Sequence, residues 1–391
     1  MTEPLPTYPW RRPCPICRAE RPQPVFNNRM APLDGLDMSY RIGLCSQCGF
    51  CYAYELPLPT TYEKYYGSLS KYDHAPNQIS IPPVDQERIK KSLQLCQPHL
   101  PQNALISDIG CGVGNLLNAF KTAGFSRLHG IDPAPASAAT AARLFGLEFI
   151  RTGSLRDAIR QLPLGETDLL CLTGVAEHLP CLSDDFGCLL KALPERALVL
   201  IEVPALERFL SPPGEAYGEF SLEHIQYFSS AMLTHLMAGF GFSPQALSIC
   251  EFKGCTDSLF GLFSRQPQAA TIPTHTTDIL RNYLDYSAEM LKKSLQKIVD
   301  RNTTFAIFGA GSHTARLLPQ LEQLGLTSRI LAIVDNNPNL RGKKLGDFVI
   351  QPDDFLASIP GCTVLVSSFN AQGAISARLA GHHPTLLLYD I

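Results

Sequence analysis

Short apolar runs alternate with stretches of helical spacing through the middle of the chain. Runs of strand length lie at residues 104–106, 128–131, 147–150, 168–172 and 198–203. Between them, apolar residues recur three or four positions apart, as they do on one face of a helix. Strands that alternate with helices predict a mostly parallel sheet covered on both faces. The expected fold class is therefore α/β, with a doubly wound sheet.

The same alternation returns at the carboxyl end. Residues 304–308, 330–334 and 364–366 have the pattern of strands, and residues 315–324 have that of a helix. A long amphipathic helix over residues 277–302 precedes them. This region predicts a second, Rossmann-like α/β domain.

The first central strand runs straight into a glycine turn. Asp108 is followed by Gly110, Gly112 and Gly114 before helical spacing resumes at Leu116. Glycine permits a positive φ and lets a ligand lie against the backbone. The dinucleotide pattern G-x-G-x-x-G places its glycines differently, and a carboxylate ahead of the turn would repel a pyrophosphate. The order D-x-G-x-G-x-G suits a ligand with an ammonium and a sulfonium, and it resembles motif I of the class I S-adenosylmethionine (SAM) methyltransferases.

A second acidic residue, Asp132, stands at the end of the next strand. At the switch point of a parallel sheet such a carboxylate can accept hydrogen bonds from ribose hydroxyls. Ser154 and Leu155 follow the third strand, where the adenine should lie. The alternative is a doubly wound domain that binds another nucleotide. The expected cofactor contacts are Asp108, Gly110, Gly112, Gly114, Asp132, Pro133, Ser154, Leu155 and Thr173.

Two Glu-His pairs are candidates for proton transfer. Glu177-His178 follows the fourth strand, where loops line the ligand crevice, and Glu223-His224 lies further along the chain. Histidine exchanges protons near neutral pH, and a neighbouring carboxylate can hold its tautomer. His224 with Glu223 is the leading general base, and His178 is a second catalytic candidate. Alternatively, residues 223–229 only start a helix, with aromatic side chains in the core and a serine N-cap.

Four cysteines near the amino terminus have the spacing of metal ligands. Cys14 and Cys17 form one C-x2-C pair, and Cys45 and Cys48 form another. Four thiolates at this spacing are typical of a closed, structural zinc site. The alternative is two redox or buried pairs. Cys51 is a possible spare ligand, but the alternating pattern around it favours a strand position.

An aromatic, polar segment follows the cysteines. It runs from Tyr62 to His74, and it is either a wet loop or a lid over the substrate. Tyr66 and Tyr72 are the substrate contacts expected from it.

A second glycine turn lies in the carboxyl-terminal region. Gly309 and Gly311 follow a strand, and Asp335 ends the next one. Without a third glycine this pattern is weak evidence for NAD. The cations at residues 341–344 could hold a diphosphate, although a solvated loop is the commoner role. The last strand closes at residues 367–370, a segment that ends in Asn370.

Composition argues against nucleic acid and membrane partners. The chain has 391 residues, and its formal net charge of −3 gives no general attraction to polyanions. No apolar run approaches the roughly 20 residues of a membrane span, and the first residues lack the apolar core of a signal peptide. Most of the 13 cysteines stand singly in apolar segments, which is typical of a reducing compartment. We therefore expect a cytoplasmic protein that acts on a small molecule.

The whole chain resembles the three-domain sugar C-methyltransferases, which act on nucleotide-linked keto-deoxysugars. The resemblance rests on the four cysteines, residues 223–229 (EHIQYFS), residues 201–204 (IEVP) and residues 334–338 (VDNNP). It implies a zinc-binding module with its aromatic lid segment at 1–75, a methyltransferase domain at 76–265, a linker and helix at 266–302, and a Rossmann-like domain at 303–391.

The resemblance also implies roles for residues. His224 would remove a proton beside a ketone, with Glu223 next to it and His178 near the acceptor, so that the enolate takes the methyl group of SAM. The carboxyl-terminal domain would help to bind a nucleotide-diphosphate sugar through Gly309, Gly311, Asp335 and Asn370. Two departures concern the acceptor: Ser221 stands where the family usually has a tyrosine, and residues 253–259 differ from the family's Gly-Gly-Ser-Leu run. The alternatives are an O- or N-methyltransferase of another glycan precursor or a secondary metabolite, and a scaffold with an inert SAM domain.

Overall fold

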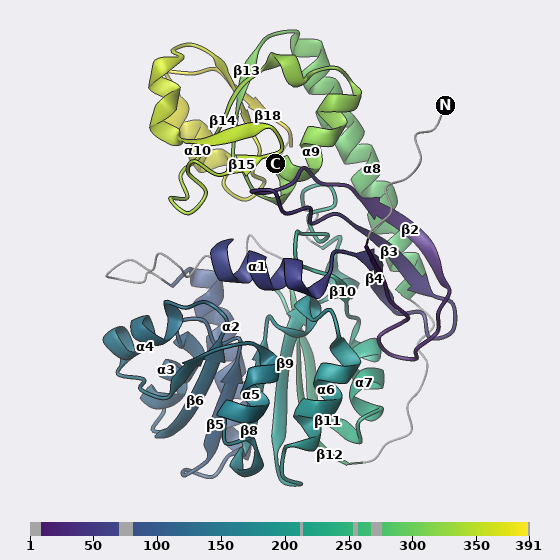
Figure 1. The fold of residues 1–391 in the computed structure, drawn as a ribbon, viewed down its shortest axis with the longest axis vertical. Helices are drawn as coiled ribbons and strands as arrows, with labels where there is room; N and C mark the ends of the chain where they lie inside the picture. The colour runs from purple at the N-terminus through teal and green to yellow at the C-terminus, as the bar shows by residue number, and fades with distance from the viewer. Residues whose placement is uncertain (1–8, 70–80, 212–213, 253–256, 267–275, 390–391) are drawn as a thin grey trace.

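The structure is a computed structural model, and it describes residues 9–69, 81–211, 214–252, 257–266 and 276–389 (Figure 1). These residues form three sheets. Tyr72, one of the expected substrate contacts, lies outside the described ranges. Within those ranges no helix is long and apolar enough to cross a membrane.

The amino-terminal sheet is antiparallel and takes in a strand from the middle of the chain. Its order is β1-β4-β3-β2, and a fifth strand, β10, pairs with β4. Gln226 of β10 lies opposite Tyr52 of β4. The segment with the second Glu-His pair is thereby tied to the cysteine module. The bounds are β1 Trp10–Arg11, β2 Pro22–Asn28, β3 Tyr40–Cys45, β4 Cys51–Leu56 and β10 Gln226–Tyr227.

The aromatic segment after the cysteines forms a helix, α1, over Pro59–Leu69. Of the two readings of this segment, a wet loop or a lid, the wet loop is therefore wrong for residues 62–69. Tyr62, Tyr65 and Tyr66 have the i, i+3, i+4 spacing of one helical face, and the ring of Tyr62 is buried. In Figure 1, α1 lies between the central sheet and the carboxyl-terminal sheet.

The central sheet confirms the predicted parallel architecture. Its order is β11-β12-β9-β8-β5-β6-β7, and the pairs among β5 to β9 are parallel. The third predicted strand begins later than expected, at Ile150. The hairpin β11–β12, which pairs antiparallel to β9, was not among the expected strands. The bounds are β5 Leu105–Ile109, β6 Arg127–Asp132, β7 Ile150–Thr152, β8 Leu169–Thr173, β9 Leu198–Pro204, β11 Phe242–Cys250 and β12 Ser258–Arg265.

Helices cover both faces of the central sheet. Alternate strand residues point to opposite faces, so Leu169 and Cys171 pack with α2, α3 and α4, whereas Leu170 and Leu172 pack with α5, α6 and α7. The helices are α2 Pro83–Cys96, α3 Asn115–Thr122, α4 Ser137–Phe145, α5 Leu155–Gln161, α6 Leu182–Lys191 and α7 Ser230–Ala238. Short 3₁₀ turns lie at Gln97–His99, Leu164–Glu166, Ala176–His178, Leu206–Arg208, Thr327–Arg329 and Asp353–Ser358.

The carboxyl-terminal part is a second α/β unit, entered through the long helix α8, Thr276–Arg301. Its sheet has the order β15-β16-β14-β13-β17-β18, and the pairs among β13, β14, β16, β17 and β18 are parallel. The remaining bounds are β13 Phe305–Phe308, α9 Ser312–Gln323, β14 Ile330–Asp335, β15 Lys344–Leu345, β16 Phe348–Pro352, β17 Thr363–Val366, α10 Gln372–Leu379 and β18 Thr385–Leu387.

A buried arginine connects the carboxyl-terminal unit with the amino-terminal sheet and with the segment before β10. Arg316 of α9 is 4 % exposed. Its guanidinium donates to the side-chain oxygen of Asn28 (3.1 Å) and to the carbonyl oxygens of Ala216 (3.3 Å) and Phe220. One apolar cluster also runs through all three parts of the chain. The carboxyl-terminal unit is thus packed directly against the region that precedes His224.

Candidate functional site

A cavity of about 1200 Å³ lies at the carboxyl ends of β5, β6 and β8. Parallel sheets bind ligands at this edge. Most of the expected cofactor residues line it, namely Asp108, Gly110, Asp132, Pro133, Ser154, Leu155 and Thr173. Gly112 and Gly114 belong to the same turn without lining the cavity.

The turn after β5 requires glycine for packing as well as for conformation. Gly110, Gly112 and Gly114 have φ values of 72°, 52° and 82°. A Cβ atom at Gly110 would lie 2.6 Å from the side chain of Val175, and one at Gly114 would lie 2.8 Å from Leu147. A larger residue would therefore be strained and would push the turn away from its neighbours.

The two acidic residues have different surroundings. Asp132 accepts hydrogen bonds from the Gly112 N–H (2.8 Å), the Ala134 N–H (2.9 Å) and the Ser137 hydroxyl (3.1 Å). Asp108 is 1 % exposed, and its Oδ1 has no hydrogen-bond partner among the described residues. Burial first, and then the charge of Asp132, raise the pKa of Asp108 well above its ordinary value. Asp108 therefore offers the cavity a carboxyl oxygen that a bound cation could satisfy.

Ser154 has a structural role in addition to its place on the cavity wall. It is the N-cap of α5, and its side chain forms a capping box with Asp157. The Asp157 carboxylate accepts from both the backbone N–H (2.9 Å) and the hydroxyl (2.7 Å) of Ser154. The capping box can be recognised in the sequence from the S-x-x-D spacing of these two residues.

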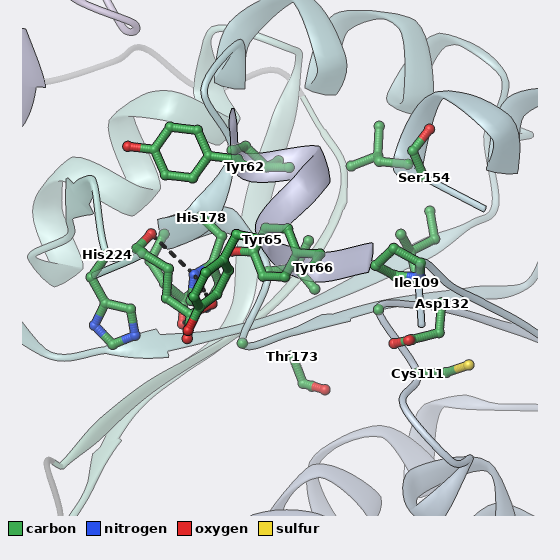
Figure 2. Close-up of a pocket in the computed structure, with 18 of the residues that line it drawn as sticks. Tyr62, Tyr65, Tyr66, Ile109, Cys111, Asp132, Ser154, Thr173, His178 and His224 are labelled. Carbon is green, nitrogen blue, oxygen red and sulfur yellow. Dashed lines mark hydrogen bonds and ion pairs between the residues drawn. The ribbon is translucent and has the colours of Figure 1, made fainter. Parts of the chain in front are cut away.

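The structure brings the two Glu-His pairs together at the far side of the cavity (Figure 2). The rings of His178 and His224 have centroids 4.9 Å apart. Nδ1 of His178 donates to the carbonyl oxygen of Glu223 (3.1 Å), so its Nε2 lacks a hydrogen in the neutral ring. Burial first, and then His178, lower the pKa of His224 to about 3. His224 is therefore neutral at ordinary pH.

The segment that carries His224 is held in a tight turn. The Ser221 hydroxyl oxygen accepts from the backbone N–H groups of Glu223 (3.4 Å) and His224 (3.1 Å). The helix expected as the alternative also exists, since Ser229 caps α7 and Tyr227 is buried. The N-cap and the buried aromatic side chain expected in the alternative are therefore present, while the role of His224 as general base stays a prediction.

Glu177 received no separate role in the sequence analysis. Its side chain is buried, and its Oε1 lies 3.7 Å from Nε2 of His178. Burial first, and then Glu202, raise the pKa of Glu177 well above its ordinary value. The motif that contains Glu202 was visible in the sequence, but nothing there placed Glu202 beside Glu177.

Arg12 was also missed, because its partners are far along the chain. Its guanidinium is buried and donates to the carbonyl oxygens of Ala53 (2.7 Å), Pro180 (2.6 Å) and Ile225 (3.0 Å). Pro180 follows His178 by two residues, and Ile225 follows His224 directly. One arginine of the cysteine module thus holds both histidine loops.

Helix α1 and the carboxyl-terminal turn complete the cavity wall. Tyr66 lines it, and its ring is nearly perpendicular to that of His178 at a centroid distance of 6.2 Å. Gly311 lines it from the other side, together with Ser312 and Asn337. The cavity therefore lies between two α/β units and is covered by α1.

Three of the carboxyl-terminal residues singled out in the sequence do not line the cavity. Asp335 accepts from the backbone N–H groups of Ala310 (2.7 Å) and Asn337 (2.7 Å), and so shapes the turn from behind. Gly309 has a φ of 108°, and a Cβ there would lie 2.8 Å from the carbonyl oxygen of Ser367. Asn370 is exposed to solvent.

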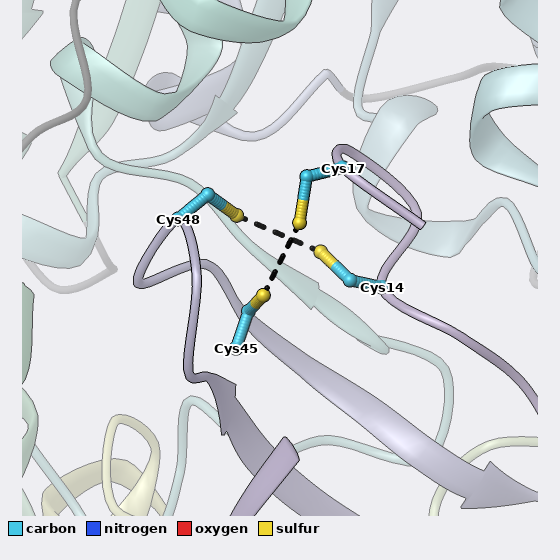
Figure 3. Close-up of side chains that lie close together, drawn as sticks. All are labelled: Cys14, Cys17, Cys45 and Cys48. Atoms are coloured by element: carbon cyan, nitrogen blue, oxygen red, sulfur yellow. Dashed lines mark hydrogen bonds between the residues drawn. The ribbon is translucent and has the colours of Figure 1, made fainter. Parts of the chain in front are cut away.

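The four amino-terminal cysteines converge on one point (Figure 3). Their sulfur atoms all lie within 4.8 Å of one another, with Cys14 and Cys48 3.6 Å apart and Cys17 and Cys45 3.3 Å apart. Thiolates bound at about 2.3 Å to a tetrahedral zinc ion lie about 3.8 Å apart. The sulfurs are therefore placed to hold such an ion. Cys51 is a buried residue of β4, as predicted.

Comparison with known proteins identifies the central part. Residues 85–247 match a family model described as "Methyltransferase domain". The chain therefore contains a SAM-dependent methyltransferase domain with the class I fold. The matched segment includes β5 to β9 and both Glu-His pairs. No curated protein matches the chain.

Several solved methyltransferases are similar to this part of the chain. The magnesium protoporphyrin IX methyltransferase (ChlM) of Synechocystis PCC 6803, with bound S-adenosylhomocysteine (SAH), is 16 % identical, covers 52 % of this chain and 99 % of its own, and has a TM-score of 0.39. The 1,6-didemethyltoxoflavin-N1-methyltransferase of Burkholderia thailandensis is 16 % identical over 63 % of this chain and 100 % of its own, with a TM-score of 0.41. The N-methyltransferase NodS of Bradyrhizobium japonicum WM9 is 15 % identical over 49 % and 100 %, with a TM-score of 0.37.

The residues of this methyltransferase fit its methyl donor. The buried, unpartnered oxygen of Asp108 suits a cationic group, and no side chain at Gly110 blocks the approach to the turn. Asp132 has lone pairs to spare, because a carboxylate accepts about four hydrogen bonds and three are in place. The cavity wall thus combines hydrogen-bond acceptors with backbone that no side chain covers. These features suit the ammonium, the sulfonium and the ribose hydroxyls of SAM.

Proposed function

We propose that this enzyme is a C-methyltransferase of a nucleotide-linked keto-deoxysugar. The observation that carries the proposal is the shared cavity, because the SAM-site residues, both histidines and the second glycine turn line one space of about 1200 Å³. A pocket for a single ligand typically measures roughly 300–1,000 Å³. The cavity therefore has room for a methyl donor and an extended acceptor together.

The proposal assigns the parts of the chain as follows. Residues 1–75 would hold a structural zinc ion on the four cysteines, and residues 76–265 would bind SAM and carry out the methyl transfer. Residues 266–302 would connect this domain to residues 303–391, which would bind the nucleotide end of the acceptor. Gly311 would contact that end, while Gly309 and Asp335 shape its turn. Tyr66, Tyr72 and Asn370 are the further proposed substrate contacts.

The donor would be held at the first glycine turn. Asp108 and the turn from Gly110 to Gly114 would hold the amino acid end, Asp132 the ribose, and Ser154 with Leu155 the adenine. When bound, SAM supplies a methyl group on a sulfonium, which needs positioning more than covalent help from the protein.

The acceptor must lose a proton before a carbon atom can take a methyl group. His224 is neutral and lines the cavity, so it can remove the proton beside the ketone. His178 lies against it, and Glu223 stabilises the His178 ring through its carbonyl oxygen. The carbon that lost the proton then attacks the methyl group, and the electrons of the broken carbon–sulfur bond remain on sulfur.

Hydrogen exchange tests the proposal without the transfer step. A panel of nucleotide-diphosphate keto-deoxysugars is incubated in D2O with the SAH-saturated enzyme, and deuterium beside the ketone is measured by mass spectrometry. We expect exchange with at least one sugar, and a loss of roughly 10²–10⁴-fold in His224→Ala with SAH affinity unchanged. His99→Ala, an exposed histidine outside the cavity, is the control. Methylation of oxygen or nitrogen without exchange would establish the heteroatom alternative instead.

A further inference from the structure

Glu177 is a carboxyl group in the cavity wall that the proposed reaction does not use. It is 3 % exposed, it lines the cavity, and its Oε2 has no hydrogen-bond partner within the described part of the chain. A buried polar atom of this kind costs roughly 1–3 kcal/mol unless a ligand satisfies it. The orphan oxygen therefore points to a group that arrives with the acceptor.

The charges around Glu177 favour its protonated form. Glu202 approaches from β9 and Glu223 from the segment before β10, while Arg88 of α2 is the neighbouring cation. Arg88 lies nearer to Glu202, with its Nε 3.6 Å from Oε1 of that residue. Two like charges and burial outweigh this one cation, so the pKa of Glu177 is raised.

Two histidines lie close to Glu177. His178 donates its Nδ1 hydrogen to the carbonyl oxygen of Glu223, and its Nε2 lies 3.7 Å from Oε1 of Glu177. The pKa of His224, the third member of this cluster, is lowered by burial and then by His178, so His224 is neutral. A protonated Glu177 has one O–H to donate, and among the described residues its Oε2 has no hydrogen-bond partner, in a residue that lines the cavity.

We propose that Glu177 is the acid that protonates the carbonyl oxygen of the acceptor while His224 removes the proton from the neighbouring carbon. The assignment rests on the proposed function. The carbon–hydrogen bond breaks, its electrons form the carbon–carbon double bond, and the oxygen takes the Glu177 proton, which leaves a neutral enol, a carboxylate and an imidazolium. As the enol carbon takes the methyl group of SAM, the O–H proton returns to Glu177. His224 then releases its proton to solvent.

The negative charges of the cavity wall give a reason for an acid at this position. An enolate would place a negative charge beside Glu202 and Glu223, which is unfavourable at close range in a low dielectric. Ser221 offers no obvious substitute, because its hydroxyl oxygen accepts from two backbone N–H groups at the base of the turn. Protonation of the oxygen keeps the acceptor neutral and avoids this repulsion.

The pH profile of hydrogen exchange tests the assignment. The rate is measured with SAH bound, with the keto-sugar found above, in the wild type and in Glu177→Gln. Neutral Glu177 exists below its raised pKa and is lost as the pH rises, so the wild-type rate should fall on the alkaline side. Glutamine can donate a hydrogen bond but cannot transfer a proton at these pH values. The variant should exchange roughly 10²–10⁴-fold more slowly, without the alkaline fall and with unchanged SAH affinity.

Glu148→Gln is the matched control, because Glu148 is exposed and does not line the cavity. It should retain both the rate and the pH profile. A wild-type profile without an alkaline fall would overturn the proposal, whatever the folding of the variant. So would a Glu177→Gln enzyme with normal exchange, or metal analysis showing a second ion per chain that this substitution removes. If the wild type exchanges no keto-sugar at all, the proposed function fails first and this inference with it.

Discussion

Replacing Arg12 by methionine should both destabilise the protein and slow its chemistry. Methionine keeps much of the apolar stem but removes all three hydrogen bonds to Ala53, Pro180 and Ile225. The last two carbonyl groups belong to the loops of the proposed catalytic histidines. The perturbation therefore acts on the position of His178 and His224 without touching either ring.

The magnitude follows from two opposing contributions. Hydrogen bonds from a charged donor contribute roughly 1.5–3 kcal/mol each. Burial lowers the pKa of Arg12 from 12.5 to about 10, and at about 1.36 kcal/mol per unit this is about 3 kcal/mol against the charged form. The net loss in Arg12→Met is then roughly 2–6 kcal/mol, which corresponds to a urea midpoint lower by roughly 0.5–2 M, because m rises with chain length.

The assay combines urea unfolding, SAH titration calorimetry and turnover of the native fraction. We expect the lower midpoint, SAH affinity within about twofold because the donor residues are remote from Arg12, and turnover reduced at least about tenfold by misplaced histidines. Arg11→Met is the matched control, since Arg11 is 61 % exposed and its pair with Glu55 spans 3.6 Å. Such a pair contributes about 1 kcal/mol or less. Equal effects of the two substitutions, or an Arg12→Met enzyme of normal turnover, would refute the reasoning.

Two further predictions concern the bound groups. Asp132→Ala should weaken SAH binding at least about tenfold, because it removes the acceptor proposed for the ribose and frees three donors. Unchanged affinity in calorimetry would contradict the ribose placement. Asp184→Ala, at an exposed carboxylate that does not line the cavity, is its control. Metal analysis of the purified protein should find one zinc ion per chain. The Cys45→Ser variant should lose this ion, and its amino-terminal sheet should no longer unfold cooperatively. A wild-type zinc content well below one per chain would remove the zinc assignment.

The features that the sequence predicted correctly have local signals. The parallel strands, the turn from Gly110 to Gly114 and the long helix α8 each follow from spacing within one stretch. The four cysteines are similar, because two C-x2-C pairs indicate a cluster even before the fold is known. These patterns reflect local backbone and ligand requirements, so they can be recognised in the sequence without knowledge of tertiary contacts.

The features that were missed depend on distant partners. Arg12 contacts carbonyl groups 168 and 213 residues away, and β10 joins a sheet whose other strands end before residue 57. Helix α1 was misread because its polar aromatic residues suit a loop as well as a helix, and its tyrosines find their packing only against the rest of the fold. The sequence placed Glu177 in a loop at the ligand crevice, but its burial and its closeness to Glu202 depend on the tertiary fold.

The same contacts explain why an ion remote from the cavity can matter for chemistry. Cys14 is two residues from Arg12, and its backbone N–H donates to the carbonyl oxygen of Ala19 (2.8 Å) in the loop that the cysteines close. The two histidine loops are also joined to each other, since the Ile225 N–H donates to the carbonyl oxygen of Glu177 (2.9 Å). Loss of the metal would free the segment that carries Arg12, and through Arg12 both loops. A metal ion held by the four cysteines would thus act on the two histidine loops through position alone.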